Sequence, residues 1–497
     1  MALSFPRYGH PAFAWIALVP LLVALSGWRG EAGRVPGQRP LRALGLGFAA
    51  GLVYFVGTTY WTSGVLATFG GLPLPLAILA MLLLAAYLAL FPALGAVVTA
   101  RMVNRAGLLG LFFAVPAWVA TEFLRGLLFG GFPWVPLGNS QVTVLPVAQL
   151  ASVLGVYGVS ALVALVNVSI AVALVGAGRT RRNALVAAAV PVFAVGVWGA
   201  WRIADGRLLR EGTPIRVGLI QGNIEQSDKW DPGQARRIFT TYLALTRDAV
   251  GRGAEYVIWP ESATPFSFEA DPVGQLALRE LAREVRVPIL FGSDQTVPGD
   301  PPRHYNAAFL LDAHGRTAAV YRKIHLVPFG EFVPFAEWLS FFPPLVQTLA
   351  GFAPFTPGDA IVMLPVGDRL SSTAICYEVV YPSLVRQAVL AGSQLLTTIT
   401  NDAWYGRSSA PFQHFELAAM RAIEHGRYLA RAANTGISGV VDPYGRVVQR
   451  SGIFEEAALV AEARFLAGRT IYTAIGDVAA YAAIAIVLAG LVTAGRR

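Results

Sequence analysis

Three side chains that could carry out acyl chemistry lie in short motifs in the second half of the sequence. Glu261 lies in YVIWPES, Lys323 in YRKIHLVPFGEF and Cys376 in SSTAICYE. A cysteine reacts as its thiolate, and a nearby carboxylate can take the thiol proton. Attack on an acyl carbon builds negative charge on oxygen, which a lysine ammonium can stabilise. Together the three residues supply a base, a cation and a nucleophile.

Each of these residues also has a purely structural interpretation. A lone Glu after a strand is usually a solvated strand end, and a lone Cys is more often a small core hydrophobe. Cys376 is the only cysteine, which excludes an intrachain disulfide. The six histidines show no metal-ligand spacing, so we expect neither a metal nor a cofactor.

Lysine is scarce in this chain. Of the 39 lysines and arginines only Lys229 and Lys323 are lysines, which leaves 37 arginines. A lysine retained in such a sequence indicates a position where arginine does not serve, since an ammonium is a compact point charge.

The elements that must position the three residues alternate between strands and helices. The expected strands are 215–224, 256–262, 287–294, 305–311, 318–322, 371–378 and 395–400. The expected helices are 233–251, 272–285, 412–426 and one after Pro382, with a final hairpin at 442–445. Such alternation predicts an α/β domain, in which functional groups gather in the loops after strands.

The rest of the chain is strongly apolar. Hydrophobic residues make up 55% of the sequence and charged residues 14%. Seven stretches are apolar enough to cross a membrane: 11–28, 43–61, 72–100, 106–123, 150–177, 183–201 and 473–494. The sequence therefore predicts a membrane region over 1–205 with about six spans, an extramembrane domain over 214–465 and a last span over 473–494.

Arginines concentrate in alternate loops between the apolar stretches. They follow the first, third, fifth and last stretches, and the connection 62–71 carries no charge. Because positively charged loops stay in the cytoplasm, the domain 214–465 is expected to face outward. The net charge of +9 fits this loop pattern better than nucleic-acid binding, and no nucleic-acid-binding motif is present.

Longer strings around the candidate residues resemble a known family. They are QGNIEQSDKW (221–230), LVPFGEFVP (326–334), AICYE (374–378) and TNDAWYG (400–406). These strings resemble the nitrilase superfamily, whose members use a Glu–Lys–Cys triad. With spans on both sides, the chain resembles the bacterial apolipoprotein N-acyltransferases. The resemblance implies a membrane α-helical bundle plus an extramembrane α/β, nitrilase-like α-β-β-α sandwich domain.

The resemblance also implies a reaction. An acyl chain passes from a membrane phospholipid to Cys376 as a thioester, and then to the N-terminal amine of the diacylglyceryl-cysteine of an apolipoprotein. By this resemblance Glu261 is the base, Lys323 stabilises the oxyanion and Cys376 is the nucleophile.

Further residues match positions that the family needs for activity or for the architecture of the site. They are Trp230, Glu331, Tyr377 and Glu378. The backbone N–H of Tyr377, directly after the nucleophile, is a natural second donor to the oxyanion. Trp230 could instead serve packing, and Glu331 could instead be a helix N-cap or an ion-pair partner.

The resemblance further predicts partners and location. The expected partners are a phospholipid acyl donor, a diacylated apolipoprotein acceptor and membrane lipids, with no nucleic acid, and the chain is expected to act as a monomer. The expected location is the bacterial inner membrane, as a multi-pass protein with its catalytic domain on the periplasmic side. The family usually has eight spans and this sequence shows seven, so we expect a first helix to be missing from the N-terminus.

Two other functions compete with acyl transfer to lipoproteins. A membrane-tethered nitrilase-type amidohydrolase would use water as its acceptor, and the triad is compatible with it. The apolar stretch 335–355 has one charge, Glu337, in 21 residues, and it favours lipid substrates if it does not simply pack in the core. A transporter is disfavoured because the spans show no intramembrane ion relay.

Overall fold

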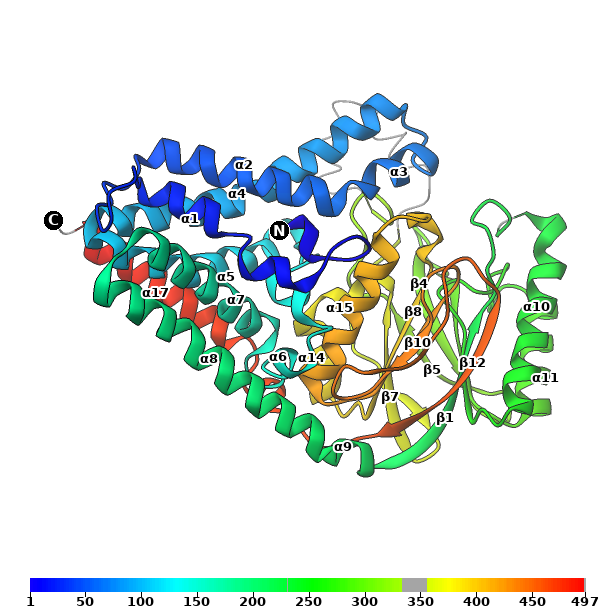
Figure 1. Ribbon diagram of the computed structural model, residues 1–497. Helices are drawn as coiled ribbons and strands as arrows, with labels where there is room; N and C mark the ends of the chain where they lie inside the picture. Colours follow the sequence, from blue (N-terminus) through cyan, green and yellow to red (C-terminus); the bar gives the residue numbers. More distant parts are fainter. Residues whose placement is uncertain (230, 333–354, 496–497) are drawn as a thin grey trace. The chain divides into compact units, whose positions relative to one another are not determined.

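The chain forms two compact units in the computed structural model, which describes residues 1–229, 231–332 and 355–495 (Figure 1). The first unit comprises Met1–Ala67, Leu72–Gly206 and Thr470–Arg497, and the second comprises Thr68–Gly71 and Arg207–Arg469. Trp230 and nearly all of the apolar stretch 335–355 lie outside the described residues. The interpretations given above for these residues therefore stay predictions.

The first unit is helical. Its main helices are α1 (Val19–Ser26), α2 (Pro40–Thr59), α4 (Leu74–Ala106), α5 (Ala114–Arg125), α7 (Ala151–Val175), α8 (Gly178–Asp205) and α17 (Val478–Gly495). Within the described residues, four continuous helical segments are long and apolar enough to cross a membrane: Pro40–Thr59, Leu74–Arg125, Ala151–Val175 and Gly178–Arg210. The first and last apolar stretches of the sequence contain shorter apolar helices, within Pro11–Ser26 and Val478–Thr493.

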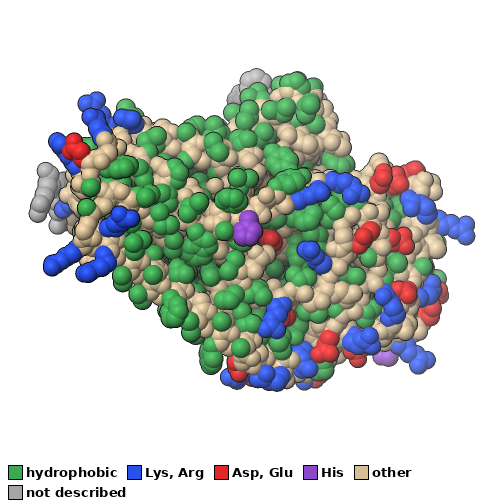
Figure 2. Space-filling view, viewed as in Figure 1, with side chains coloured by type: hydrophobic (Ala, Val, Ile, Leu, Met, Phe, Trp, Pro, Cys, Tyr) green, Lys and Arg blue, Asp and Glu red, His purple; other side chains and the backbone are tan. Residues whose placement is uncertain are grey.

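The surfaces of the two units differ in kind. Hydrophobic side chains cover much of the visible helical unit, whereas acidic and basic side chains are interspersed over the second unit (Figure 2). Many large apolar side chains of the helical unit are exposed, among them Leu41, Val53, Leu83, Phe193 and Trp201. Lipid is the solvent that suits such a surface, so the chain is a membrane protein.

The second unit contains two six-stranded sheets. One has the order β12-β1-β2-β3-β4-β5 and the other the order β11-β10-β9-β8-β7-β6. The strands of the first sheet are β1 (Thr213–Gln221), β2 (Tyr256–Ile258), β3 (Ile289–Val297), β4 (Arg303–Leu311), β5 (Thr317–Arg322) and β12 (Ala457–Phe465). The strands of the second are β6 (Leu364–Val366), β7 (Arg369–Ile375), β8 (Leu395–Thr400), β9 (Leu429–Ala433), β10 (Gly439–Val441) and β11 (Val447–Arg450).

The two sheets pack face to face between two layers of helices. Side chains from both sheets, such as Val217, Ile258, Ile375 and Leu395, form one buried cluster. Helices α10 (Pro232–Gly251) and α11 (Pro272–Val285) lie beside the first sheet, and α14 (Pro382–Leu390) and α15 (Ala410–His425) beside the second (Figure 1). The predicted α-β-β-α sandwich is therefore confirmed.

The strands expected from the sequence are all present, with shifted ends, and three strands were missed. The missed strands are β6, β9 and β12. Strand β12 contains AALVAEAR, whose alanines give no clear apolar alternation, yet it pairs antiparallel with the whole of β1. Such a segment forms a strand because it pairs with β1, since its own sequence pattern is weak.

Candidate active site

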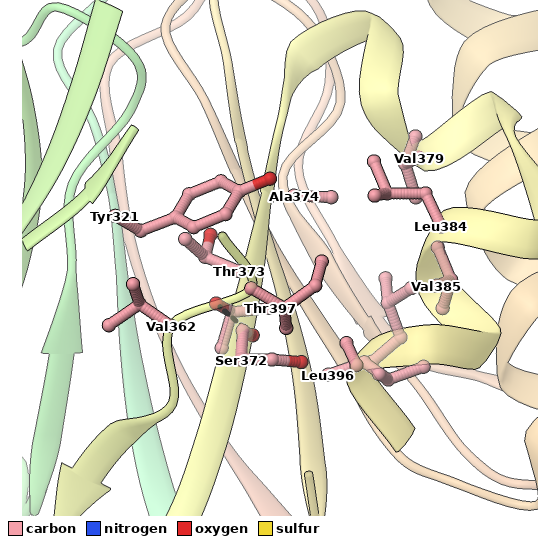
Figure 3. A pocket seen from close by; sticks show the side chains of 13 residues that line it. Tyr321, Val362, Ser372, Thr373, Ala374, Val379, Leu384, Val385, Leu396 and Thr397 are labelled. Carbon is pink, nitrogen blue, oxygen red and sulfur yellow. Dashed lines mark hydrogen bonds between the residues drawn. The ribbon is translucent and has the colours of Figure 1, made fainter. Parts of the chain in front are cut away.

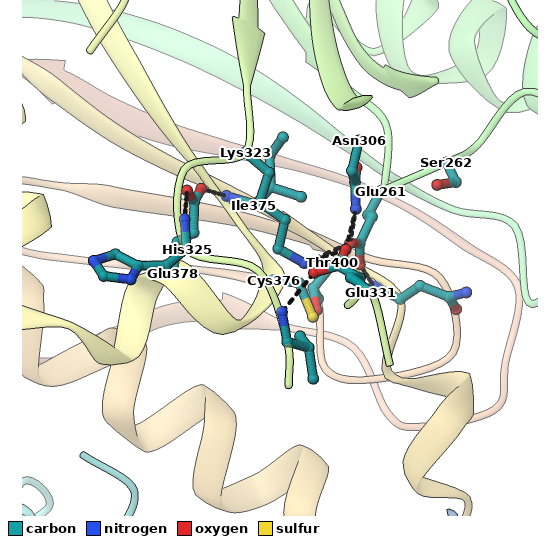
Figure 4. Close-up of polar contacts among 12 residues, drawn as sticks. Glu261, Ser262, Asn306, Lys323, His325, Glu331, Ile375, Cys376, Glu378 and Thr400 are labelled. Carbon is teal, nitrogen blue, oxygen red and sulfur yellow. Dashed lines mark hydrogen bonds and ion pairs between the residues drawn. The ribbon is translucent and has the colours of Figure 1, made fainter. Parts of the chain in front are cut away.

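The carboxyl ends of three strands position the three candidate residues. Glu261 is the third residue after β2, Lys323 comes directly after β5, and Cys376 comes directly after β7. All three residues are buried, with 6%, 1% and 5% of their surface exposed. Figure 4 shows the three side chains converging from these separate strands. The sandwich therefore brings together three residues whose positions span more than a hundred residues of the sequence.

The Glu261 carboxylate is held at both oxygens. Its Oε1 accepts hydrogen bonds from the Asn306 amide at 2.7 Å and from Lys323 Nζ at 3.3 Å. Its Oε2 accepts from the backbone N–H of Asn401 at 2.9 Å. Glu261 is therefore not a solvated strand end.

Glu331 provides a second carboxylate to the same ammonium. Its Oε1 lies 2.8 Å from Lys323 Nζ and accepts from the Asn306 amide at 2.9 Å, while its Oε2 accepts from the backbone N–H of Val327 at 2.7 Å. Glu331 is thus an ion-pair partner of Lys323, and it lies in the same buried cluster as Glu261. Lys323 Nζ is held between two carboxylates, which leaves the ammonium little rotational freedom.

Glu378 ties the turn at Cys376 to the loop after Lys323. One carboxylate oxygen accepts from the backbone N–H groups of Ile324 at 2.6 Å and His325 at 3.1 Å and from the Tyr321 hydroxyl at 2.8 Å. The other accepts from the backbone N–H of Ile375, directly before the cysteine, at 2.7 Å. Four donors on one buried carboxylate fix the distance between these two segments.

The backbone of Cys376 is left-handed, with a φ of 54°. This conformation is uncommon outside glycine and persists where the surroundings hold it. Tyr377, the next residue, is buried, and its ring meets that of Tyr381 edge-on at 5.2 Å. The sharp turn directs the thiol of Cys376 toward Glu261 and Lys323 rather than into the sheet (Figure 4).

The electrostatics of the site favour a protonated thiol beside an ionised carboxylate. Burial and the Glu261 carboxylate raise the pKa of Cys376 to about 12. Burial alone would raise the pKa of Glu261, but the Lys323 ammonium and the Asn306 amide hold it below its ordinary value. Burial would lower the pKa of Lys323, but Glu331 and Glu261 raise it, so its ammonium stays charged. An ionised carboxylate beside a protonated thiol is available to accept the thiol proton.

The structure also adds residues that the sequence analysis did not assign to the site. Asn306 bridges the two glutamates, and Asn401 holds Glu261 through its backbone. Lys229 is buried, and its Nζ lies 3.4 Å from the carbonyl oxygen of Glu261. The scarcity of lysine pointed to Lys229 as well as to Lys323, whereas Asn401 contributes a backbone group that no residue pattern reveals.

Lys229 is expected to set the pH dependence of the site. Besides Lys229, Glu261 faces the charged groups Lys323, Glu331 and Asp294. Replacing Lys229 with Met removes a positive charge, so the pKa of Glu261 should rise. The acidic limb of the rate of thioester formation should then move to higher pH.

The matched variant is Asp294→Asn, which removes a negative charge near Glu261 and should move the acidic limb to lower pH. The measurement is the rate of acylation of Cys376 against pH for both variants. An acidic limb that stays in place in both would contradict this assignment.

A pocket in the same unit lies beside β7 (Figure 3). Tyr321 and Val362 line it on one side, and Val379, Leu384 and Val385 on the other. It includes neither Glu261, Lys323 nor Cys376.

Comparison with known proteins gives the family. The profile of the apolipoprotein N-acyltransferase N-terminal domain matches residues 1–169, and that of the carbon-nitrogen hydrolases matches residues 216–469. The apolipoprotein N-acyltransferase of Geobacter metallireducens is 39% identical over 493 residues, which cover 98% of this chain and 91% of the relative. The chain belongs to the apolipoprotein N-acyltransferase family.

Other family members align over a similar extent. The apolipoprotein N-acyltransferase of Nitrosomonas europaea is 34% identical over 503 residues, which cover 99% of this chain and 95% of the relative. Among solved structures, an amidase from Nesterenkonia sp. aligns with a TM-score of 0.40 and 25% identity, covering 52% of this chain and 93% of the amidase. Family membership thus extends over both units, and the carbon-nitrogen hydrolase match covers the unit that holds Cys376.

Proposed function

We propose that this enzyme transfers an acyl chain from a membrane phospholipid, through a thioester on Cys376, to the N-terminal amine of the diacylglyceryl-cysteine of apolipoproteins. Membership of the family supports the substrates. The observation that carries the chemistry is the buried cluster in which Lys323 Nζ lies 3.3 Å from Glu261 and 2.8 Å from Glu331, beside the only cysteine.

In the first half-reaction the sulfur of Cys376 attacks the ester carbonyl of the phospholipid. Glu261 takes the thiol proton as the S–C bond forms, and the carbonyl oxygen becomes an oxyanion. Lys323 and the backbone N–H of Tyr377 stabilise that oxyanion. Collapse breaks the C–O bond, and the lysophospholipid oxygen leaves with the proton held by Glu261.

In the second half-reaction the neutral α-amine of the lipoprotein attacks the thioester carbonyl. Glu261 accepts a proton from the nitrogen, and the same donors stabilise the second oxyanion. Collapse breaks the C–S bond, forms the amide and returns the proton to the sulfur of Cys376. Glu331 and Glu378 take no proton in this scheme, because the first orients Lys323 and the second holds the turn at Cys376.

The alternative function, amide hydrolysis, differs only in the acceptor. Water would attack the thioester, and the acyl chain would leave as a free acid. The apolar helical unit favours a donor and an acceptor that both reside in the membrane. All proposed catalytic side chains come from one chain, so a monomer suffices.

Incubation of the purified enzyme with labelled phospholipid tests the proposal. Without acceptor we expect one acyl group on Cys376, released by hydroxylamine, and none on Cys376→Ala. Addition of a diacylated lipopeptide should then yield the triacylated amide, detected by mass spectrometry. Acylation that persists in Cys376→Ala, or release of free fatty acid with no lipopeptide product, would overturn the proposed function.

We also propose a multi-pass topology in the bacterial inner membrane with the catalytic unit on the periplasmic side. The arginine-rich loops support this orientation. A reporter that is active only in the cytoplasm, inserted near Gly299, should stay silent. The same reporter after Arg182, in an arginine-rich loop, should be active. A bright signal at Gly299 would contradict the orientation and remove access to lipoproteins outside the cytoplasm.

A further inference from the structure

A histidine lies directly behind the nucleophile. His414, on α15, is fully buried, and its Nε2 is 3.1 Å from the backbone carbonyl oxygen of Cys376. A carbonyl oxygen can only accept a hydrogen bond, so Nε2 must carry the hydrogen. The reaction scheme above does not use this histidine.

Two charged residues hold the other side of the imidazole. His414 Nδ1 lies 3.0 Å from Asp402 Oδ1 and 3.1 Å from a guanidinium nitrogen of Arg431. Arg431 donates to Asp402 Oδ2 at 2.8 Å, and Thr400 donates to Asp402 Oδ1 at 2.9 Å. A neutral ring accepts from Arg431 at Nδ1, and a charged ring donates to Asp402. In both states Nε2 keeps its hydrogen for Cys376.

These side chains form a continuous chain with no solvent contact. Asp402, His414 and Arg431 each have 0% of their side-chain surface exposed. Burying an aspartate and an arginine costs free energy unless the two charges pair, as Asp402 and Arg431 do. His414 links this pair to one backbone carbonyl, that of Cys376. Such a chain restrains the position of that carbonyl far better than a single exposed hydrogen bond would.

The restrained carbonyl belongs to the peptide that stabilises the oxyanion. The C=O of Cys376 and the N–H of Tyr377 lie in one planar amide and point in opposite directions. Fixing the carbonyl toward His414 therefore fixes the direction of the N–H. The left-handed φ of 54° at Cys376 is a conformation that persists only where the surroundings hold it, and the bond to His414 adds to the bond between the Ile375 N–H and Glu378.

We propose that the Arg431–Asp402–His414 chain is a positioning device that holds the Cys376–Tyr377 peptide with its N–H aimed at the developing oxyanion. The inference rests on the proposed function, because it takes the Tyr377 N–H as an oxyanion donor. His414 touches no reacting atom in this assignment. It acts through the backbone of the nucleophile, and its loss should slow every step that builds an oxyanion.

Two reactions of the same thiol separate this role from a merely structural one. Acylation by p-nitrophenyl butyrate passes through an oxyanion but needs no recognition of phospholipid. Alkylation by iodoacetamide needs the sulfur of Cys376 but builds no oxyanion. In His414→Ala the acylation burst should slow by about 10²-fold, typical of losing one oxyanion donor, while the alkylation rate is retained. His414→Gln, which can still donate an N–H to the carbonyl, should recover part of the loss.

Gln413→Ala is the matched control, because it removes the neighbouring buried polar side chain of the same helix, which donates to Ser409. It should leave both rates unchanged. Equal losses of acylation and alkylation in His414→Ala, or normal acylation in that variant, would overturn the inference. If the wild type fails to acylate the lipopeptide from phospholipid, the proposed function is refuted. The butyrate burst is measured in a separate assay, so this outcome is distinct from failure of the inference about His414.

Discussion

Replacing Glu261 with Gln is expected to slow thioester formation on Cys376 by about 10³-fold, within the range for loss of a general base. Glutamine has the same size, and its amide oxygen can still accept from the Asn401 N–H. It cannot take the thiol proton, and it cannot return that proton to the leaving lysophospholipid oxygen. The loss should therefore fall on the chemical step, measured as the rate of acylation at saturating donor.

Alkylation of the Glu261→Gln variant provides an internal control. Burial is the main reason why the pKa of Cys376 is high, and the Glu261 carboxylate is the next. Removing that negative charge should lower the pKa of Cys376 and partly offset the loss of the proton acceptor, so alkylation by iodoacetamide should slow less than acylation, which also needs a proton returned to the leaving group. Glu284→Gln makes the same change in an exposed pair with Arg247 and should leave acylation unchanged. Acylation of Glu261→Gln within about tenfold of the wild type would exclude Glu261 as the base.

Replacing Lys323 with Arg is expected to cost about 10²–10³-fold in acylation, although the charge is kept. Lys323 Nζ lies 2.8 Å from Glu331 and 3.3 Å from Glu261 in a site with only 1% of the lysine side chain exposed. A guanidinium is longer, planar and forked, so it would pair bidentately with one carboxylate or displace the acyl carbonyl.

Thermal stability separates this catalytic loss from misfolding of the Lys323→Arg variant. Arg316→Lys, the reverse exchange in an exposed pair with Asp312, is the matched control and should change neither activity nor melting temperature. Near-normal acylation of Lys323→Arg at normal stability would exclude Lys323 as the oxyanion cation. If Lys323→Arg loses both its fold and its activity, Lys323→Met is the variant to measure. Methionine fits the same space without a charge, so Lys323→Met should remain inactive.

Much of this protein could be predicted from its sequence because the relevant patterns are local. Long apolar runs predict helices in lipid, and strands that alternate with helices predict an α/β layer. The motifs around Glu261, Lys323 and Cys376 each follow a strand, where an α/β fold exposes functional groups. Lysine scarcity marked both Lys229 and Lys323, and both are buried around Glu261.

Only the tertiary structure decided how these motifs meet. Asn306 comes from β4, in the same sheet as β2, and bonds to Glu261 across that sheet. Asn401 follows β8 and reaches Glu261 from the other sheet, because the two sheets face each other. No residue pattern predicts a contact made through the backbone of Asn401. Nor does any pattern place His414, which reaches Cys376 from a helix 38 positions later. Sequence spacing specifies which side chains are available, whereas the packing of the sheets and helices determines the distances and burial on which their chemistry depends.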